Sequence, residues 1–247
     1  MRRSVDVEEL LDGPLDDGRV LVGNLRDLTR ANRWLGGVRL SALGLAALAP
    51  ADMPLSVVDI GTGAADIPLA LIDRARATRR RLSVTAVDNR PEILDAAVLA
   101  QPRLTTTADL ALRVADGRAL PFPDRSFDIA HTSLVLHHLE PPAAVDLLRE
   151  MARVARRGVV VNDLVRGRAA WLGAWLLSHL VTTNRFTRND APLSVSRAYT
   201  VAELTSLIAA AGLRVEASAF GPFGHRVMLA ATTAPAGADG PSAGDPP

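Results

Sequence analysis

The amino-acid sequence predicts an α/β fold in which a doubly wound, mostly parallel sheet carries helices on both faces. Three observations support this prediction. From residue 55 onward, short apolar runs of strand length alternate with longer helical patterns. A glycine pair, Gly61 and Gly63, follows the first apolar run. Two acidic residues, Asp88 and Asp116, then close the second and third runs.

Composition narrows the range of functions. The chain has 247 residues, of which 48% are hydrophobic and 22% charged, as is typical of a globular protein. Its net charge of +1 gives no field that would gather nucleic acid. The sequence contains neither cysteine nor lysine, so disulfides, thiolate catalysis and Schiff-base chemistry are excluded. No metal site is predicted.

Residues 1–50 are predicted to form an N-terminal helical cap or lid. Apolar residues between Val22 and Leu35 follow one helical stripe, and a second apolar helix ends at Pro50. Residues 51–233 form the main domain. Residues 234–247 are rich in Pro, Gly and Ala and are predicted to be a disordered tail.

Within the main domain the elements follow in order. The predicted strands cover residues 55–60, 82–87, 110–115, 127–130, 158–161, 213–219 and 226–232. The predicted helices cover residues 66–78, 91–100, 141–156 and 200–211, the last opened by a capping box at Thr200 and Glu203. Residues 167–199 interrupt the alternation as an insert: an apolar stretch to 183, then polar residues 184–199 that we expect to be irregular.

The turn at Gly61 and Gly63 predicts a ligand site, because ligands of parallel sheets bind beyond the carboxyl ends of the strands. A dinucleotide would need a helix start that attracts its pyrophosphate. Here that helix starts with Asp66, which would repel pyrophosphate and would suit a cationic ligand such as S-adenosylmethionine (SAM). Asp66 could also be a simple N-cap.

Asp88 and Asp116 strengthen the prediction of a nucleoside ligand. A carboxylate at the position of Asp88 can bind ribose hydroxyls, although NAD sites use the same contact. A carboxylate at Asp116 can accept from an adenine amino group. Either acid alone could be a solvated loop residue, but their occurrence in order at successive strand ends favours a shared site.

Four segments make the chain resemble class I SAM-dependent methyltransferases. They cover residues 57–65, 84–88, 115–128 and 133–139. The resemblance is to the broad group that includes ubiquinone/menaquinone-type C-methyltransferases and small-molecule O-methyltransferases. It implies a Rossmann-like sheet of seven strands with the last one antiparallel. One departure is Ala65, where the family signature usually has a third glycine.

The resemblance also implies roles for residues. Asp59, Gly61 and Gly63 would surround the methionine part of SAM, and Thr132 and Ser133 would line its sulfonium side. The predicted cofactor-binding residues are Asp59, Gly61, Thr62, Gly63, Asp66, Asp88, Asn89, Asp116, Gly117, Thr132 and Ser133.

His137 and Asp163 are the predicted catalytic residues. A histidine that titrates near neutrality is a natural general base for an acceptor hydroxyl. The alternative for His137 and its neighbour His138 is that they only cap the helix that starts near Pro141. The acceptor pocket is expected in the insert, where Trp171, Trp175 and Phe186 would form an aromatic wall; packing on the sheet or a homodimer contact would also explain these side chains.

The sequence thus predicts a SAM-dependent methyltransferase that acts on a small aromatic or quinone-like acceptor, by O-methylation in secondary metabolism. C-methylation of a quinol precursor, an NAD(P)-dependent oxidoreductase and a non-catalytic SAM-fold scaffold are the alternatives. We expect a cytoplasmic protein without a membrane span, because residues 1–9 carry acids where a secretory signal is apolar and no apolar stretch reaches about 20 residues.

Overall fold

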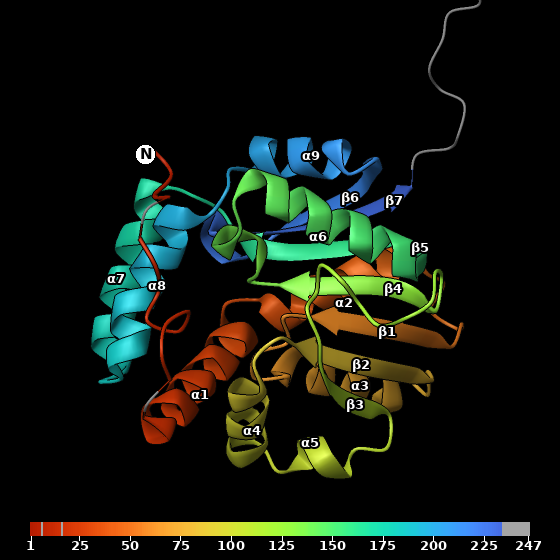
Figure 1. Ribbon diagram of the computed structural model, residues 1–247, viewed down its shortest axis with the longest axis horizontal. Coiled ribbons are helices and arrows are strands. Elements are labelled where there is room, and N and C mark those ends of the chain that lie inside the picture. Colours follow the sequence, from red (N-terminus) through yellow and green to blue (C-terminus); the bar gives the residue numbers. More distant parts are fainter. Residues whose placement is uncertain (6, 16, 234–247) are drawn as a thin grey trace, which may run out of the picture.

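A seven-stranded sheet forms the centre of the protein (Figure 1). The structure is a computed structural model that describes residues 1–5, 7–15 and 17–233. The strand order is β3-β2-β1-β4-β5-β7-β6, and β7 runs antiparallel to both of its neighbours. The strands are β1 (Leu55–Ile60), β2 (Leu82–Asp88), β3 (Leu110–Val114), β4 (Phe127–Ser133), β5 (Ala155–Leu164), β6 (Leu213–Phe220) and β7 (Arg226–Thr233). The predicted fold class is confirmed.

Helices cover both faces of the sheet. They are α1 (Gly18–Trp34), α2 (Gly37–Leu48), α3 (Asp66–Ala77), α4 (Pro91–Ala100), α5 (Arg103–Thr106), α6 (Pro141–Val154), α7 (Arg168–Val181), α8 (Arg185–Arg197) and α9 (Val201–Ala210), with the 3-10 turns η1 (Leu136–His138) and η2 (Pro222–Gly224). α6 and α9 pack on one face, and α2 and α3 pack on the other.

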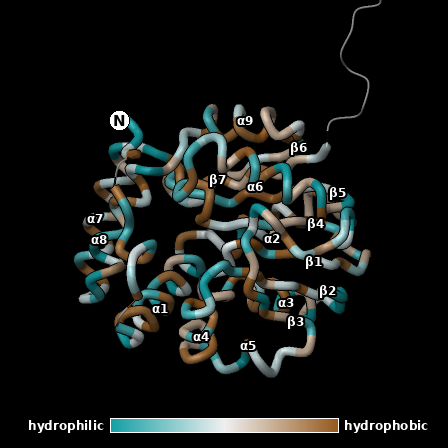
Figure 2. The backbone as a smooth tube through the Cα atoms, in the orientation of Figure 1, coloured by the Kyte–Doolittle hydropathy of each residue, from teal (hydrophilic) through white to brown (hydrophobic). Residues whose placement is uncertain are grey.

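Alternation along the strands explains the two-sided core. In β1, Val57 faces the cluster formed with α2 and α3, whereas Val58 faces the cluster formed with α6 and α9. Helices α1 and α4 pack together beside the end of the sheet, and Figure 2 shows alternating hydrophobic and hydrophilic segments along both. Each helix therefore buries one face.

The strand order places the predicted site. It reverses between β1 and β4, so a crevice is expected beyond the carboxyl ends of these two neighbours. Helix α1 lies at this edge, because it packs against α4 and leads directly to α2. Helix α2 packs on the sheet core through Leu40 and Leu45. The domain division at residue 50 stays a prediction.

The prediction of an irregular segment at residues 184–199 is wrong, because α8 occupies residues 185–197. The segment lacks an apolar stripe and contains Pro192. Four of its seven buried residues are polar: Asp190, Ser194, Ser196 and Arg197. Asp190 and Arg197 pair with the N-terminal segment, so hydrophobic periodicity could not identify the helix.

Strands β4 and β5 are also longer than predicted. The sequence patterns ended at residues 130 and 161 because polar residues follow, yet His131 and Asn162 are buried inside the strands. The predicted disordered tail, residues 234–247, lies outside the described residues. Among the helices of the described part, none has the length and apolar character needed to cross a membrane.

Candidate active site

The loop between β1 and α3 has the backbone of a ligand-binding turn. Gly61, Gly63 and Ala65 all have positive φ values, at 68°, 52° and 49°. A Cβ on Gly61 would lie 2.3 Å from Cγ2 of Val135, so only glycine allows this close approach to η1. A Cβ on Gly63 would meet no atom within 4 Å. The backbone at Gly63 is therefore open to a ligand.

Asp88 holds this loop from the neighbouring strand. Its Oδ2 accepts a hydrogen bond from the amide of Gly63 at 3.0 Å, and its Oδ1 accepts from the amide of Arg90 at 3.2 Å. The side chain is buried, and this burial raises its pKa despite the two amide donors. Asp88 thus places a buried carboxylate beside the open glycine turn.

The side chains of Asp59 and Thr132 form hydrogen bonds within the protein. The Asp59 carboxylate accepts from the Thr62 hydroxyl at 2.6 Å and bonds with Nδ1 of His131 at 2.5 Å. The Thr132 hydroxyl donates to the carbonyl of Ile60 at 2.9 Å, which joins β4 to β1. These predicted cofactor-binding side chains therefore shape the loop.

Asp66 is the first residue of α3, and the N-cap position is taken by Ala65. The alternative in which Asp66 caps the helix is therefore wrong. Its Oδ1 accepts from the Asn32 amide of α1 at 3.2 Å. Burial raises the pKa of Asp66 to about 6, although Asn32 and Arg226 act in the opposite direction.

Arg226 is a buried cation that the sequence analysis did not identify. Its Nε donates to Oδ1 of Asn162 at 2.6 Å, and its two terminal nitrogens donate to Oδ1 of Asn32 at 2.7 Å and to Oγ of Ser133 at 2.6 Å. Burial lowers its pKa to about 10. Its only sequence signal is a charge that precedes the apolar run of β7.

The Arg226 contacts complete a buried polar network. Asn162 donates to the hydroxyl of Ser41 at 2.7 Å, and Ser41 bonds with Nε2 of His131 at 2.8 Å. A continuous chain of hydrogen bonds therefore joins Asp59 to Asp66. It passes through one residue each of β4, α2, β5, β7 and α1. The two acids on either side of the glycine turn are joined through the helices that precede the sheet.

His137 and Asp163 form a buried pair at the ends of neighbouring strands. His137 Nδ1 lies 2.7 Å from Asp163 Oδ1. Burial alone would raise the pKa of Asp163, but His137 and Arg226 contribute to a net lowering. The alternative in which the histidines cap α6 is wrong, because Glu140 takes that position. The structure thus supplies a histidine with a carboxylate that fixes its ring.

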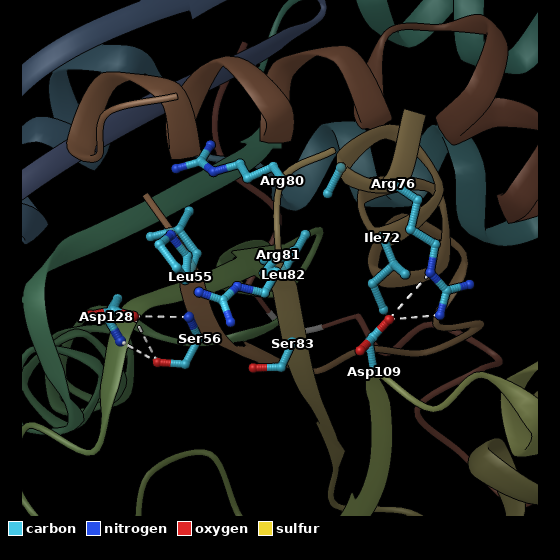
Figure 3. A pocket seen from close by; sticks show the side chains of 12 residues that line it. Leu55, Ser56, Ile72, Arg76, Arg80, Arg81, Leu82, Ser83, Asp109 and Asp128 are labelled. Carbon is cyan, nitrogen blue, oxygen red and sulfur yellow. Dashed lines mark hydrogen bonds and ion pairs between the residues drawn. The ribbon is translucent and has the colours of Figure 1, made fainter. Parts of the chain in front are cut away.

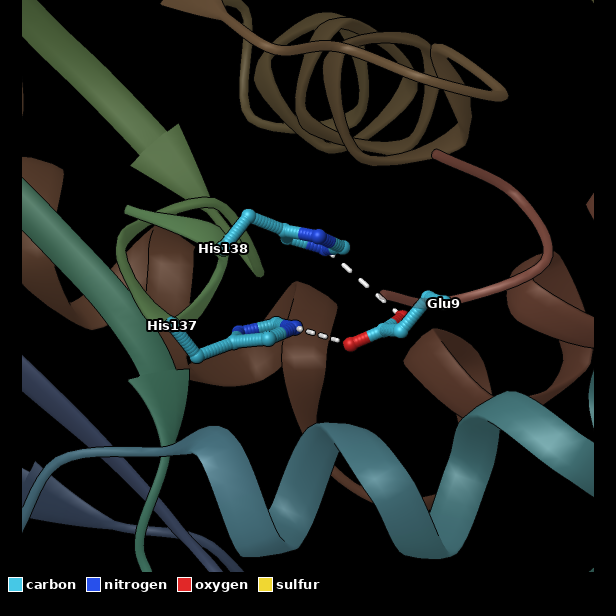
Figure 4. Close-up of side chains that lie close together, drawn as sticks. All are labelled: Glu9, His137 and His138. Atoms are coloured by element: carbon cyan, nitrogen blue, oxygen red, sulfur yellow. Dashed lines mark ion pairs between the residues drawn. The ribbon is translucent and has the colours of Figure 1, made fainter. Parts of the chain in front are cut away.

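An N-terminal strap, described over residues 1–5 and 7–15, covers this pair. The carboxylate of Asp190 in α8 accepts from the amides of Leu10 and Leu11 at 2.8 and 3.0 Å. Glu9 is buried, with its Oε1 3.7 Å from Nε2 of His137 (Figure 4). Burial raises the pKa of Glu9 to about 7.

The predicted adenine-side residues lie apart from this group. Asn89 and Asp116 are exposed, and Asp116 pairs with Arg118 at 3.1 Å. Close packing explains the glycine at position 117, because a Cβ on Gly117 would lie 2.5 Å from Cγ2 of Ile60. The structure therefore joins Asp88 to the glycine turn but leaves Asn89 and Asp116 outside the hydrogen-bonded group.

The comparisons with known proteins agree with this geometry. Residues 57–158 match the family described as methyltransferase domain. The chain is 31% identical over 100 residues to the ubiquinone/menaquinone biosynthesis C-methyltransferase UbiE of Rickettsia massiliae (strain Mtu5). That alignment covers 40% of this chain and 40% of the relative, so the chain spans less than half the length of the curated relatives it matches.

Solved structures share the fold. A SAM-dependent methyltransferase from Aquifex aeolicus has a TM-score of 0.61 at 18% identity, over 85% of this chain and 97% of that one. The mitomycin 7-O-methyltransferase MmcR has a TM-score of 0.59 at 20% identity, over 85% and 60%. The matched family segment contains the glycine turn and Asp88.

Residues 57–158 thus match a methyltransferase domain, and the surrounding sheet has the fold of the solved SAM-dependent methyltransferase. Beyond this methyltransferase domain, the insert does not gather its aromatic residues on one surface. Trp171 and Trp175 of α7 are 37% and 41% exposed, whereas Phe186 of α8 is buried.

A cavity of about 520 Å³ lies at the opposite edge of the methyltransferase domain, at the amino ends of β1 and β2 (Figure 3). Most of its charged side chains already have partners. Arg76 pairs with Asp109 at 2.6 Å, and Asp128 accepts from Ser56 at 2.8 and 2.9 Å. We therefore place the candidate site at the glycine turn.

Proposed function

We propose that the protein transfers the methyl group of SAM to a hydroxyl of a small aromatic or quinone-like acceptor. When bound, SAM supplies a methyl group that its sulfonium already activates for displacement. The remaining requirements are to hold the cofactor, to align the acceptor, to exclude water and to remove a proton. Such positioning can supply about 7–11 kcal/mol of the barrier reduction.

The glycine turn fits a cationic nucleoside ligand. The space beside Gly63 is open, the buried carboxylate of Asp88 accepts from the Gly63 amide, and the buried Asp66 starts the helix that follows the turn. Desolvation raises the pKa of both acids, so a nearby positive charge would stabilise their ionised forms. In this proposal Asp88 binds the ribose hydroxyls and Asp66 faces the ammonium group. Gly61, Gly63 and Ser133 complete the methionine side, and Asn89, Asp116 and Gly117 lie toward the adenine.

The observation that carries the choice of oxygen is the His137–Asp163 pair. The carboxylate accepts from Nδ1, so Nε2 of the ring can accept a proton. An acceptor phenol has a pKa of about 10, and a base is needed to make it nucleophilic near neutral pH. With SAM bound, His137 would take the hydroxyl proton of the acceptor, whose oxygen would receive the methyl group as the carbon–sulfur bond breaks.

The acceptor class rests on the insert and on one relative. α7 presents the partly exposed Trp171 and Trp175 on an apolar helix, and such aromatic faces suit a flat acceptor. The relative MmcR is named as a mitomycin 7-O-methyltransferase, which supports a role in secondary metabolism.

C-methylation of a quinol precursor is the second candidate. The observation that favours it is the match to UbiE, which is named as a C-methyltransferase of ubiquinone and menaquinone biosynthesis. The same base could serve this reaction, because a quinol is activated at carbon by loss of a hydroxyl proton. The two candidates therefore differ in acceptor and in the atom that receives the methyl group.

Incubation with methyl-labelled SAM and a panel of phenols and quinols tests the proposal. We expect a methyl ether, located on oxygen by mass spectrometry. His137→Asn should lower kcat about 100-fold or more with little change in SAM affinity, and His225→Asn should behave as the wild type. A ring-methylated quinol would support the second candidate. SAM binding without transfer to any acceptor, or full turnover in His137→Asn, would contradict the proposed chemistry.

A further inference from the structure

The geometry points to a binding site for Zn²⁺ formed by Glu9, His137 and His138, and we propose that the protein binds this ion there. One ligand atom from each residue lies within 4.8 Å of the other two. Figure 4 shows the two imidazole rings converging on the Glu9 carboxylate from η1. The three residues come from two parts of the chain that are more than 120 positions apart.

The contacts in this cluster are too long for hydrogen bonds. Nε2 of His137 lies 3.7 Å from Oε1 of Glu9, and Nε2 of His138 lies 3.9 Å from Oε2. Glu9 is only 4% exposed, and its Oε1 has no hydrogen-bond partner among the described residues. A buried carboxylate oxygen without a partner is costly, which indicates that a ligand satisfies it.

Two further carboxylates set the orientation of both rings. Nδ1 of His137 lies 2.7 Å from Asp163, and Nδ1 of His138 lies 3.0 Å from Asp12. An ionised carboxylate only accepts, so each Nδ1 is the donor, and in the neutral form of each ring Nε2 carries a lone pair. Both lone pairs therefore face the oxygens of Glu9, and a cation between them turns this repulsion into attraction.

The donor set selects the kind of ion. Two imidazoles and one carboxylate match catalytic zinc sites, in which a fourth position remains open. Zinc bonds to such nitrogen and oxygen ligands are about 2.0–2.2 Å long, so one ion can bridge atoms up to about 4 Å apart. Mg²⁺ and Ca²⁺ prefer oxygen ligands. The carboxylate–histidine contacts are those that commonly support metal-bound histidines.

The site is accessible and its ligands can be tested separately from methyl transfer. The side chain of His138 is 22% exposed, which gives an entry route. Nε2 of His137 can hold either an ion or the proton of an acceptor. Metal binding is therefore measured without SAM or acceptor, and its result does not depend on the proposed methyl transfer.

The test uses the full chain, freed of metal by a chelator and dialysed. Titration with Zn²⁺ in a calorimeter measures affinity, and Co²⁺ absorbance in the visible range reports a low-coordinate nitrogen and oxygen site. We expect one site with micromolar or tighter affinity for Zn²⁺ and no saturable binding of Mg²⁺. Glu9→Gln and His138→Gln should each weaken Zn²⁺ binding at least 100-fold, and Asp12→Asn by about 10–100-fold.

Glu8→Gln is the matched control, because Glu8 is the exposed neighbour of Glu9 in the strap. It should bind Zn²⁺ as the wild type does. Circular dichroism and thermal unfolding of each variant show whether it folds. The proposal is overturned if the wild type binds no Zn²⁺ at 100-micromolar concentrations, or if folded Glu9→Gln and His138→Gln both keep wild-type affinity.

Discussion

At the scale of single residues, Asp66 has the environment that most directly links the glycine turn to pH. The groups that face it are Asn32 of α1, Arg226 of β7 and Asp59 of β1. Burial raises its pKa from 3.8 to about 6. Because this folded-state pKa exceeds the unfolded value, ionisation of Asp66 disfavours the fold, and its contribution to stability falls as pH rises from about 4 to 6.

SAM binding should show the opposite trend with pH. If Asp66 faces the ammonium group, the ligand prefers the ionised acid, and SAM affinity should weaken as pH falls below about 6, approaching tenfold per pH unit. Calorimetry between pH 5 and 8 measures this. Asp66→Asn should bind SAM more weakly at pH 8 and lose most of the slope.

Asp95→Asn serves as the control, because Asp95 is an exposed acid of α4. It should keep the wild-type profile. A wild-type affinity that stays constant from pH 5 to pH 8 would show that Asp66 does not face the ligand charge.

Some residues of the site can be predicted from the neighbouring sequence, and others depend on contacts with distant parts of the chain. Gly61, Gly63 and Asp88 follow strands in recognisable order, so the sequence predicts them and the structure places them together. Arg226 donates a hydrogen bond to Asn32, which is 194 positions away in the sequence. No local sequence pattern predicts such a pair. Buried polar networks of this kind depend on tertiary neighbours, which hydrophobic periodicity does not describe.

At the scale of elements, the strap and α8 depend on each other. Asp190 accepts two backbone amides of the strap, and Arg197 pairs with Asp12 at 3.1 Å. The described residues of the strap pair with no strand of the sheet, so these side chains satisfy part of its backbone. The polar face of α8 is the reason that the sequence pattern predicted an irregular segment.

Asp190→Ala should release the strap. It removes two hydrogen bonds to a charged acceptor, each worth about 1.5–3 kcal/mol in a buried setting. Hydrogen exchange measured by mass spectrometry should show faster exchange in peptides that contain Leu10 and Leu11, with the strands of the sheet unchanged.

Asp146→Ala is the matched control for this experiment. Asp146 is an exposed acid of α6 whose Arg149 contact is 3.5 Å long. In the Asp146→Ala variant, the peptides that contain Leu10 and Leu11 should exchange at the wild-type rate. Equal protection of Leu10 and Leu11 in Asp190→Ala and the wild type would mean that Asp190 does not hold the strap.

At the scale of the whole molecule, the strand order of the sheet determines which strand ends lie next to one another. Because β1 lies between β2 and β4, the glycine turn lies beside both Asp88 and Ser133. Strand alternation and turn chemistry predicted a ligand site at the carboxyl ends of the strands, but they did not predict the strand order. The sequence also predicted an N-terminal helical cap, but it did not predict the polar contacts by which α1, α8 and the strap pack, because these contacts join distant parts of the chain.

Calorimetry with SAM and with NADH on the full chain tests the central claim most directly. We expect one SAM site of micromolar affinity and no NADH binding, because Asp66 at the start of α3 repels a pyrophosphate. Asp88→Ala should abolish SAM binding, whereas Asp95→Ala should keep it. NADH binding without SAM binding, or micromolar SAM affinity in Asp88→Ala, would contradict the account.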